Sequence, residues 1–260
     1  MIKGVLIDIA GVVTAGNAIV PGAAKALDRL RSARLPLRFL TNTSRKPRDA
    51  VLLQLRDFDL KVRSEDVLTP AAAVAAHLRA TGATAHFLIH PALSADFSEA
   101  SQAADDKPAD AVVIGDAADG FTYAALNACF RHLAHGAELL ALAKNRSFRD
   151  ADGELSLDMG GFVAALEFAS GTKARIFGKP APAFFEAALQ SMNVAAKDAV
   201  MIGDDAEADV AGALRAGLAG GLLVRTGKYR DGDETSIDPP PTAVLADLAA
   251  AVDWILANRA

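Results

Sequence analysis

The chain begins with a short hydrophobic run that ends in a single carboxylate. Val5, Leu6 and Ile7 lead directly into Asp8, and Gly11 follows three positions later. A short apolar run rich in β-branched residues is typical of a strand buried on both faces at the centre of a parallel sheet. Asp8 then lies at the carboxyl end of that strand, where open α/β sheets bind their ligands. Asp8 alone could simply cap the next turn, but a buried unpaired carboxylate is costly and favours a nearby cation or reacting partner.

Strand patterns alternate with helical patterns in the first 70 residues, and the alternation returns after residue 173. Further buried strands are predicted over residues 35–40, 174–177, 199–202 and 221–224. Helices are predicted over residues 23–31, 47–55, 182–192 and 207–216, with a short strand and a last helix within 244–258. Because parallel strands are joined by helical crossovers, this order predicts an α/β fold with a doubly wound parallel sheet.

The middle of the chain repeats the alternation and predicts a second α/β domain inserted into the first. Strands are predicted over residues 85–89, 111–115 and 138–143, and helices over 70–80, 123–135 and 161–169. Residues 98–110 and 145–158 are polar and are expected to form loops. We therefore expect a core domain of residues 1–70 and 174–260 and an inserted domain of residues 71–173.

Composition and charge exclude several classes of function. The 260 residues are 52% hydrophobic, which is ample for a core, and the net charge is −5 without a basic block. Nucleic acid is therefore not expected as a partner. The single cysteine, Cys129, rules out an intrachain disulfide, and no apolar stretch approaches the ~20 residues of a membrane span. Asp8 also interrupts the first apolar run too early for a signal peptide. We expect a soluble, cytoplasmic protein that does not engage membranes.

Polar side chains follow four of the predicted core strands. Because the carboxyl ends of parallel strands meet at one edge of a sheet, residues far apart in the chain can converge there. The residues concerned are Asp8, Thr41, Asn42, Lys179, Asp204, Asp205 and Asp209.

These side chains form a coherent set for phosphoryl chemistry. Asp8 and Asp204 offer the carboxylate oxygens that Mg²⁺ prefers, while Lys179 offers a positive charge. Phosphoryl transfer needs alignment, charge neutralisation and a nucleophile, and Asp8 can be that nucleophile. Each piece has a simpler interpretation as a helix cap or a surface turn. The hypothesis of a phosphoryl-transfer site fails only if every one of these simpler interpretations is correct at the same time.

The same motifs resemble those of the haloacid dehalogenase superfamily. The order is Asp-x-x-Gly-Val, Thr-Asn, Gly-Lys-Pro and Gly-Asp-Asp-x-x-x-Asp, and the insertion between the second and third motifs is similar to a C2-type cap. The chain most resembles the branch (subfamily IIA) that includes phospholysine phosphohistidine inorganic pyrophosphate phosphatase. Segments that carry this likeness include Arg38–Asn42, Met201–Asp205 and Thr226–Tyr229.

The resemblance implies a role for each matching position. Asp8 would be the nucleophile and a metal ligand, Ala10 would give its backbone carbonyl to the metal, and Asp204 would be the second metal carboxylate. The cofactor would be Mg²⁺, and the cap would close over a small phosphorylated molecule or a phospho-amino acid. A C2-type cap can also support a homodimer. The remaining matches imply phosphate binding by Thr41 and Asn42, charge neutralisation by Lys179, and support from Asp205 and Asp209.

One departure from the superfamily pattern concerns proton transfer. The usual second Asp, two residues after the nucleophile, serves as general acid and base, but here the position holds Ala10. Such proton transfer typically contributes ~10²–10⁴-fold to the rate. We therefore expect slow turnover, or a preference for activated phosphoryl compounds such as phosphoramidates, pyrophosphate and acyl phosphates, whose leaving groups need less help.

Two other functions are compatible with this pattern. Some superfamily members with Ala at this position are phosphonate C–P hydrolases, but those carry a cap between the first two motifs. Only 32 residues separate Asp8 from Thr41, too few for that cap. The second alternative is a catalytically weak protein that binds phosphorylated ligands.

The inserted domain offers weaker indications of function. Lys144, Asn145 and Asp158 lie in its most polar segment and are candidates for substrate contact. Cys129, His132 and His135 are spaced along one predicted helix, but these positions drift around the helix and no fourth ligand is evident. A structural role is favoured for this trio.

Overall fold

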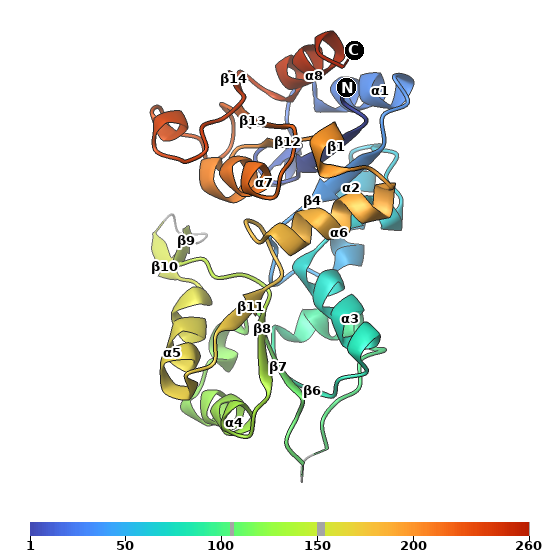
Figure 1. The fold of residues 1–260 in the computed structure, drawn as a ribbon. Helices are drawn as coiled ribbons and strands as arrows, with labels where there is room; N and C mark the ends of the chain where they lie inside the picture. The colour runs from blue at the N-terminus through green and yellow to red at the C-terminus, as the bar shows by residue number, and fades with distance from the viewer. Residues whose placement is uncertain (105–106, 150–153, 260) are drawn as a thin grey trace. The chain divides into compact units, whose positions relative to one another are not determined.

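The computed structural model describes residues 1–104, 107–149 and 154–259 (Figure 1). The chain divides into two compact units, which we call the core unit and the cap unit. The core unit contains residues 1–41, 52–68 and 179–260, and the cap unit contains residues 42–51 and 69–178. Each unit is built around its own parallel sheet. The predicted α/β class, with a doubly wound core and an inserted α/β cap, is confirmed.

The core sheet has six parallel strands in the order β14-β13-β12-β1-β4-β5. Every residue of β1 and β12 is buried, as expected for central strands of a parallel sheet. From β1 the chain continues to β4 on one side, and from β12 to β13 on the other, so the strand order reverses between β1 and β12 while all strands stay parallel. The strands are β1 (Gly4–Asp8), β4 (Leu37–Leu40), β5 (Val67–Leu68), β12 (Ala199–Gly203), β13 (Gly220–Val224) and β14 (Ala243–Leu245).

Helices cover both faces of the core sheet (Figure 1). On one face α1 (Ala23–Ser32) packs against α8 (Leu248–Ala257), and on the other α6 (Pro182–Met192) packs against α7 (Gly212–Arg215). The apolar positions that predict α1 are its buried face: Ala23, Ala26, Leu27 and Leu30. Shorter core elements are the hairpin β2 (Thr14–Ala15) and β3 (Ala18–Ile19), η1 (Ser64–Asp66), η4 (Ala196–Asp198), η5 (Ala206–Ala211) and η6 (Asp233–Thr235).

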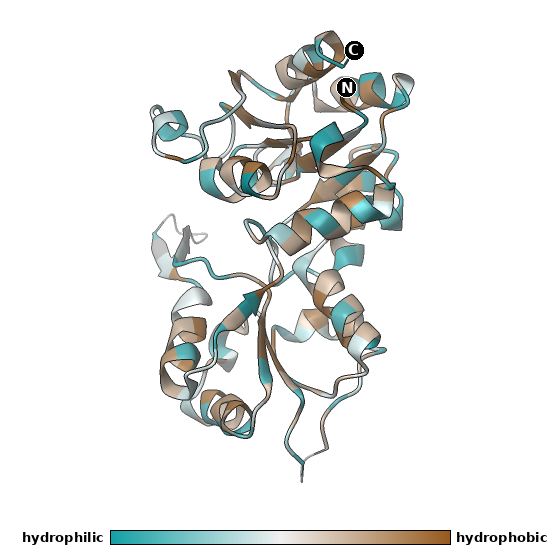
Figure 2. Cartoon of the chain, viewed as in Figure 1, coloured by the Kyte–Doolittle hydropathy of each residue, from teal (hydrophilic) through white to brown (hydrophobic). Residues whose placement is uncertain are grey.

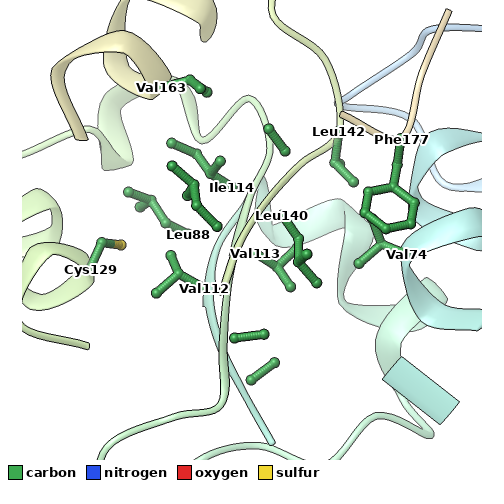
Figure 3. Packing of buried hydrophobic residues seen from close by; sticks show 14 of the residues in the cluster. Val74, Leu88, Val112, Val113, Ile114, Cys129, Leu140, Leu142, Val163 and Phe177 are labelled. Carbon is green, nitrogen blue, oxygen red and sulfur yellow. The ribbon is translucent and has the colours of Figure 1, made fainter. Parts of the chain in front are cut away.

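The cap unit has a four-stranded parallel sheet in the order β11-β8-β7-β6. Its strands are hydrophobic along most of their length (Figure 2). Val112, Val113, Ile114 and Leu140 are fully buried between the helices, and Cys129 lies in the same cluster (Figure 3). The elements are β6 (Ala85–Leu88), β7 (Ala111–Ile114), β8 (Glu138–Ala141), β11 (Ala174–Ile176), α3 (Pro70–Thr81), α4 (Tyr123–Ala134), α5 (Gly160–Ser170), η2 (Pro91–Phe97) and η3 (Ala118–Gly120).

The Cys129, His132 and His135 trio is used in packing and capping. Cys129 is completely buried. His132 Nδ1 accepts a hydrogen bond from the backbone N–H of Ala109, and the His135 ring contacts the Arg131 carbonyl. These contacts agree with the structural role that the sequence favours for the trio.

The structure differs from the expected domain boundaries in three places, the smallest being residues 69 and 70, which belong to the cap unit. Residues 174–178 belong to the cap unit because β11 pairs with β8, and residues 42–51 join the cap unit with the first turn of α2 (Arg48–Asp57). Periodicity alone could not assign these segments, because it predicts a strand or a helix but not the unit against which that element packs.

Some local elements also differ from expectation. The polar segment 145–158, expected to be a loop, contains the antiparallel strands β9 (Ser147–Arg149) and β10 (Leu155–Leu157). The expected helix over 207–216 is a π-helix, η5, followed by one turn of α7. None of the helices in the described part of the chain is long and apolar enough to cross a membrane.

Candidate active site

The two central strands of the core sheet bring Asp8 and Asp204 together. Ile7 pairs with Ile202, so Asp8 at the end of β1 lies beside the end of β12, which Asp204 follows directly. Both carboxylates are buried, with exposed fractions of 6% and 2%. The strands therefore place two carboxylates at the point where the strand order reverses, which is the usual ligand position of such folds.

Lys179 and Asp209 complete a buried ionic cluster around Asp8. The Lys179 ammonium forms an ion pair with Asp8 and a second one with Asp209, whose Oδ1 lies 2.6 Å from Nζ. Lys179 is only 4% exposed and Asp209 only 1%. Breaking a buried ion pair by removing one partner typically costs ~3–5 kcal/mol, so Lys179 holds this cluster together.

The cluster contains more negative than positive charge. Carboxylate oxygens of Asp8, Asp204 and Asp209 lie within 4.8 Å of one another. Burial raises the pKa of Asp8 above its usual range, partly offset by Lys179 and reinforced by Asp209 and Asp204. Burial, with Asp209 close by, raises the pKa of Asp204 to about 6 despite the hydrogen bond from Lys228. Three buried carboxylates beside one ammonium group leave a place for a further cation.

This cluster fits a divalent metal ion on the chemistry of its donors. Hard cations such as Mg²⁺ and Ca²⁺ take oxygen ligands, and carboxylates are the ligands offered here. The Asp8, Asp204 and Asp209 cluster is the one group of three or more candidate metal-binding side chains within residues 1–104, 107–149 and 154–259.

The loop after β13 clamps Asp204, a contribution that the sequence analysis did not assign. The Lys228 backbone N–H donates a 2.7 Å hydrogen bond to Asp204 Oδ2. A Cβ atom on Gly227 would lie 1.9 Å from the same oxygen, so this position requires glycine. A glycine and polar residues directly after a buried strand were the available sequence signal, since β13 is the neighbour of β12.

Asp205 points away from the cluster of the other three carboxylates. Its Oδ1 accepts a hydrogen bond from the Ala208 N–H at the start of η5, and its Oδ2 lies 3.2 Å from Lys228 Nζ. Burial alone would raise the pKa of Asp205, but these two partners lower it below the usual value. Asp205 therefore shapes η5, and that π-helix places Asp209 beside Lys179.

The remaining predicted core residues lie near the ends of the same strands. Thr41 is buried directly after Leu40, which pairs with Asp8 in the sheet. Ala10 is exposed two residues beyond Asp8, and its methyl group can neither donate nor accept a proton. Asn42 belongs to the cap unit, where its Oδ1 lies close to Gly178. The structure thus groups Asp8, Lys179, Asp204 and Asp209 in direct proximity.

The three cap candidates have different environments. Lys144 Nζ forms a 2.6 Å ion pair with Glu167, so its positive charge is already neutralised by a neighbouring carboxylate. Asn145 is exposed and hydrogen-bonds Asp158, which is buried and also accepts from the Met159 N–H. Burial raises the pKa of Asp158.

A second charged pair in the cap unit escaped the sequence analysis. Arg45 donates two hydrogen bonds to the buried Asp116, and both charges act on the pKa of Asp158. The pair joins residues 71 positions apart, so no local pattern marks it.

Comparison with known proteins identifies relatives over the whole chain. Family models match at both ends: haloacid dehalogenase-like hydrolase over residues 5–102 and HAD-hydrolase-like over residues 176–251. Phospholysine phosphohistidine inorganic pyrophosphate phosphatase of Rattus norvegicus is 38% identical, covering 98% of this chain and 94% of the relative. Haloacid dehalogenase-like hydrolase domain-containing protein 2 of Homo sapiens is 40% identical, covering 98% and 96%.

Solved structures show the same fold. The p-nitrophenyl phosphatase of Archaeoglobus fulgidus superposes with a TM-score of 0.89 at 23% identity, covering 97% of this chain and 98% of that one. The glycerol phosphate phosphatase of Mycobacterium tuberculosis, determined in complex with calcium, gives a TM-score of 0.82 at 29% identity, covering 95% and 74%.

Proposed function

Since the chain belongs to the haloacid dehalogenase-like hydrolase family and is a phosphatase, we propose that it is a Mg²⁺-dependent phosphohydrolase acting through a covalent phosphate on Asp8. One observation carries this proposal. The Asp8 carboxylate is buried at the end of β1, ion-paired to Lys179 and within 4.8 Å of Asp204 and Asp209 oxygens. A carboxylate with this environment is a poised nucleophile rather than a surface cap.

The chain's own residues account for alignment and charge. An Asp8 oxygen attacks phosphorus, the bond from phosphorus to the leaving group breaks, and Lys179 neutralises the charge that gathers on the phosphoryl oxygens. Thr41 and Asn42 donate hydrogen bonds to those oxygens. Water then attacks the phosphorus, which releases inorganic phosphate and restores Asp8. Asp8, Asp204 and the Ala10 carbonyl would hold Mg²⁺, which would supply additional positive charge when bound.

Asp209 and Asp205 help to position the residues of this arrangement. Asp209 holds the Lys179 ammonium at 2.6 Å, and Asp205 fixes the start of η5 through Ala208. The cap unit is assigned to substrate selection, with Asn145 and Asp158 as candidate contacts. Lys144 is a weaker candidate because Glu167 already pairs with it.

Ala10 determines which substrates react fastest. Without a side chain that donates a proton, alkyl alcohols leave slowly, whereas good leaving groups need no such help. The Rattus norvegicus relative is named for phospholysine, phosphohistidine and inorganic pyrophosphate, in which phosphorus is bonded to nitrogen or to a second phosphate. We therefore assign phosphoramidates, pyrophosphate and acyl phosphates as the preferred substrate class.

Two alternatives are weaker. In the structure, residues 9–40 form the β2–β3 hairpin, α1 and β4 of the core unit, which argues against the additional cap that the phosphonate hydrolases carry. A protein that binds phosphorylated ligands without turnover would keep the cluster but show no hydrolysis of any substrate.

A substrate screen with a nucleophile control tests the proposal. Purified protein is assayed with phosphoramidates, pyrophosphate, acetyl phosphate and alkyl phosphates, with and without Mg²⁺, beside the isosteric variant Asp8→Asn. We expect Mg²⁺-dependent release of phosphate, fastest with the activated compounds and abolished in Asp8→Asn. Full activity of Asp8→Asn would overturn the mechanism, and absence of hydrolysis in the whole panel would favour the ligand-binding alternative.

A further inference from the structure

A cleft at the amino end of the core sheet gathers positive charge in an acidic protein. It has a volume of about 730 Å³ and is formed by the end of α1, the start of β4, the segment before β5 and the end of α6. Five cationic side chains and one carboxylate line it, although the whole chain carries five more acidic than basic residues. These residues are Arg31, Arg34, Arg38, Lys61, Arg63 and Asp66.

This basic cleft lies at the opposite end of the strands from Asp8. In the register of β1 and β4, Asp8 pairs with Leu40, whereas Leu37, which lines the cleft, pairs with Val5. Three residues of strand correspond to about 10 Å. A ligand in the basic cleft is therefore outside the phosphoryl-transfer site, and its binding does not depend on the proposed function.

Two of the cations are fixed in the wall by the fold. Arg38 is 8% exposed, and its guanidinium donates to the Ser191 carbonyl and hydroxyl and lies 3.6 Å from Asp66. Arg31 donates to the Lys61 carbonyl and to Asp28. Arg31 lies in the last turn of α1, and Arg38 binds a carbonyl in the last turn of α6. Cations at helix C-termini stabilise the fold by themselves, so these two residues alone would require no ligand.

The other three cations of the cleft are less engaged in contacts within the protein. Arg63 pairs with Asp66 and Glu65, but the ammonium of Lys61 and the guanidinium of Arg34 form no hydrogen bond or ion pair in the part of the chain that the structure describes. The five cations of the cleft outnumber the nearby carboxylates of Asp28, Glu65 and Asp66, so the cleft remains net positive.

The backbone at Arg34 supports a requirement for its side chain. Arg34 has a φ of +58°, in the left-handed region that favours glycine or asparagine at the end of a helix. An arginine at this position is unfavourable for the backbone, and strain of this kind concentrates at functional positions. Clefts lined by charge of one sign also concentrate ions of the opposite sign.

We propose that the basic cleft binds an organic phosphate that carries two or more negative charges and an apolar or aromatic group. Arg34 and Lys61 contact the phosphate oxygens, and Arg31 and Arg63 add to the field. The apolar side of the cleft receives the rest of the ligand through Leu35, Pro36, Val62 and Met192. The volume lies within the range of small-molecule sites, ~300–1,000 Å³.

Calorimetric titration of the Asp8→Asn protein tests this inference, because the substitution prevents turnover at the other end of the sheet. The probes are ADP and 1-naphthyl phosphate as organic phosphates, and pyrophosphate and inorganic phosphate as simple anions, all without Mg²⁺. We expect ADP and 1-naphthyl phosphate to bind more tightly than the simple anions, and binding to weaken as salt rises.

Matched double variants locate the binding. Arg34→Ala with Lys61→Ala should weaken ADP binding about 10-fold or more, since hydrogen bonds to charged groups are lost. The control is Lys25→Ala with Arg29→Ala, two residues of α1 outside the cleft. It removes the same number of positive charges and should leave ADP binding unchanged. Equal weakening in both double variants would overturn the site, as would failure of all four probes to bind at millimolar concentration. Equal affinity for pyrophosphate and ADP would overturn its assignment to organic phosphates.

Discussion

The Asp204 carboxylate lies so close to Gly227 that a Cβ atom at position 227 would be 1.9 Å from Oδ2. Gly227→Ala should therefore displace Asp204, which is bound to the neighbouring Lys228 N–H. We expect at least ~10²-fold lower kcat/KM, because displacements of about 1 Å at a reacting centre have that effect. Steady-state kinetics over a Mg²⁺ series measures the change.

Gly232→Ala is the control for this substitution. Gly232 also has a positive φ, +97°, but a Cβ there meets no atom within 4 Å. It likewise places an alanine at positive φ, although at +97° rather than the +60° of Gly227, and it does so without the close approach, so its activity should stay near that of the wild type. Equal loss in both variants would show that strain rather than crowding is responsible.

Removal of Lys179 should destabilise the core unit unless another cation replaces its charge. In Lys179→Met, the carboxylates of Asp8 and Asp209 lose their buried partner, which should cost ~3–5 kcal/mol of unfolding free energy. Added Mg²⁺ should recover part of this loss, so the metal should raise the Tm of Lys179→Met more than that of the wild type. Thermal unfolding with and without Mg²⁺ tests the expectation.

Lys228→Met provides the comparison, because the Lys228 ammonium is exposed and pairs with Asp205 at 3.2 Å. Exposed pairs contribute ~0–1 kcal/mol, so its Tm should change little. A loss in Lys228→Met as large as in Lys179→Met would argue against the buried cluster as the cause.

Restoring a carboxyl group at position 10 should change substrate preference. Ala10→Asp supplies a proton donor two residues after Asp8, and we expect alkyl phosphate hydrolysis to rise by ~10²–10⁴-fold while pyrophosphate hydrolysis rises less. Ala10→Asn, similar in size but unable to transfer the proton, is the control. A folded Ala10→Asp variant with unchanged activity on alkyl phosphates would refute our account of substrate choice.

The cap unit should lose stability in acid because of His86. Burial, reinforced by His132 with ring centroids 4.7 Å apart, lowers the pKa of His86 below 6.5. Below pH 6.5 the unfolded chain binds a proton at His86 that the folded chain does not. Stability therefore falls as pH drops from 6.5 to the folded-state pKa, and His86 adds no pH dependence above pH 6.5. Each kcal/mol lost corresponds to about 2–4 °C in Tm for a protein of this size.

Thermal unfolding at pH 7.5 and pH 5.5 measures this effect. The drop in Tm should be smaller in His86→Gln, which does not titrate. An identical drop in both proteins would assign the acid sensitivity to other groups.

Cys129 reports on opening of the cap unit. The thiol is fully buried, and burial raises its pKa to about 12, so both access and thiolate content are low. Native protein should resist iodoacetamide for hours, and labelling should accelerate in parallel with unfolding by urea. Because the chain has one cysteine, mass spectrometry gives the rate without ambiguity. Rapid labelling without denaturant would contradict the packing around α4.

The sequence predicted those site residues that terminate buried strands. Asp8 and Asp204 follow apolar runs whose short length and β-branched residues mark central strands, and parallel pairing brings their ends together. Asp209 was grouped with these strand ends because it follows Asp204 closely in the chain, but its supporting role came from the family resemblance, and helical periodicity did not predict the π-helix that carries it.

Other features depend on contacts that no local pattern carries. The Arg45 and Asp116 pair joins distant positions, and the Gly227 approach depends on how a loop returns over β12. The cap strand β11 was assigned to the core unit because a three-residue strand contains no information about its neighbours. These features arise from tertiary packing, which overrides local preference.

The position of Asp209 depends on the number of residues in the π-helix η5. A π-helix contains one more residue per turn of hydrogen bonding than an α-helix, so deleting one of the residues 206–208 would rotate Asp209 away from Lys179 while leaving its side chain intact. A lineage could thus lose or regain this ion pair through a single codon deletion or insertion. Homologues that differ in length at this turn are therefore where we expect the chemistry to have diverged.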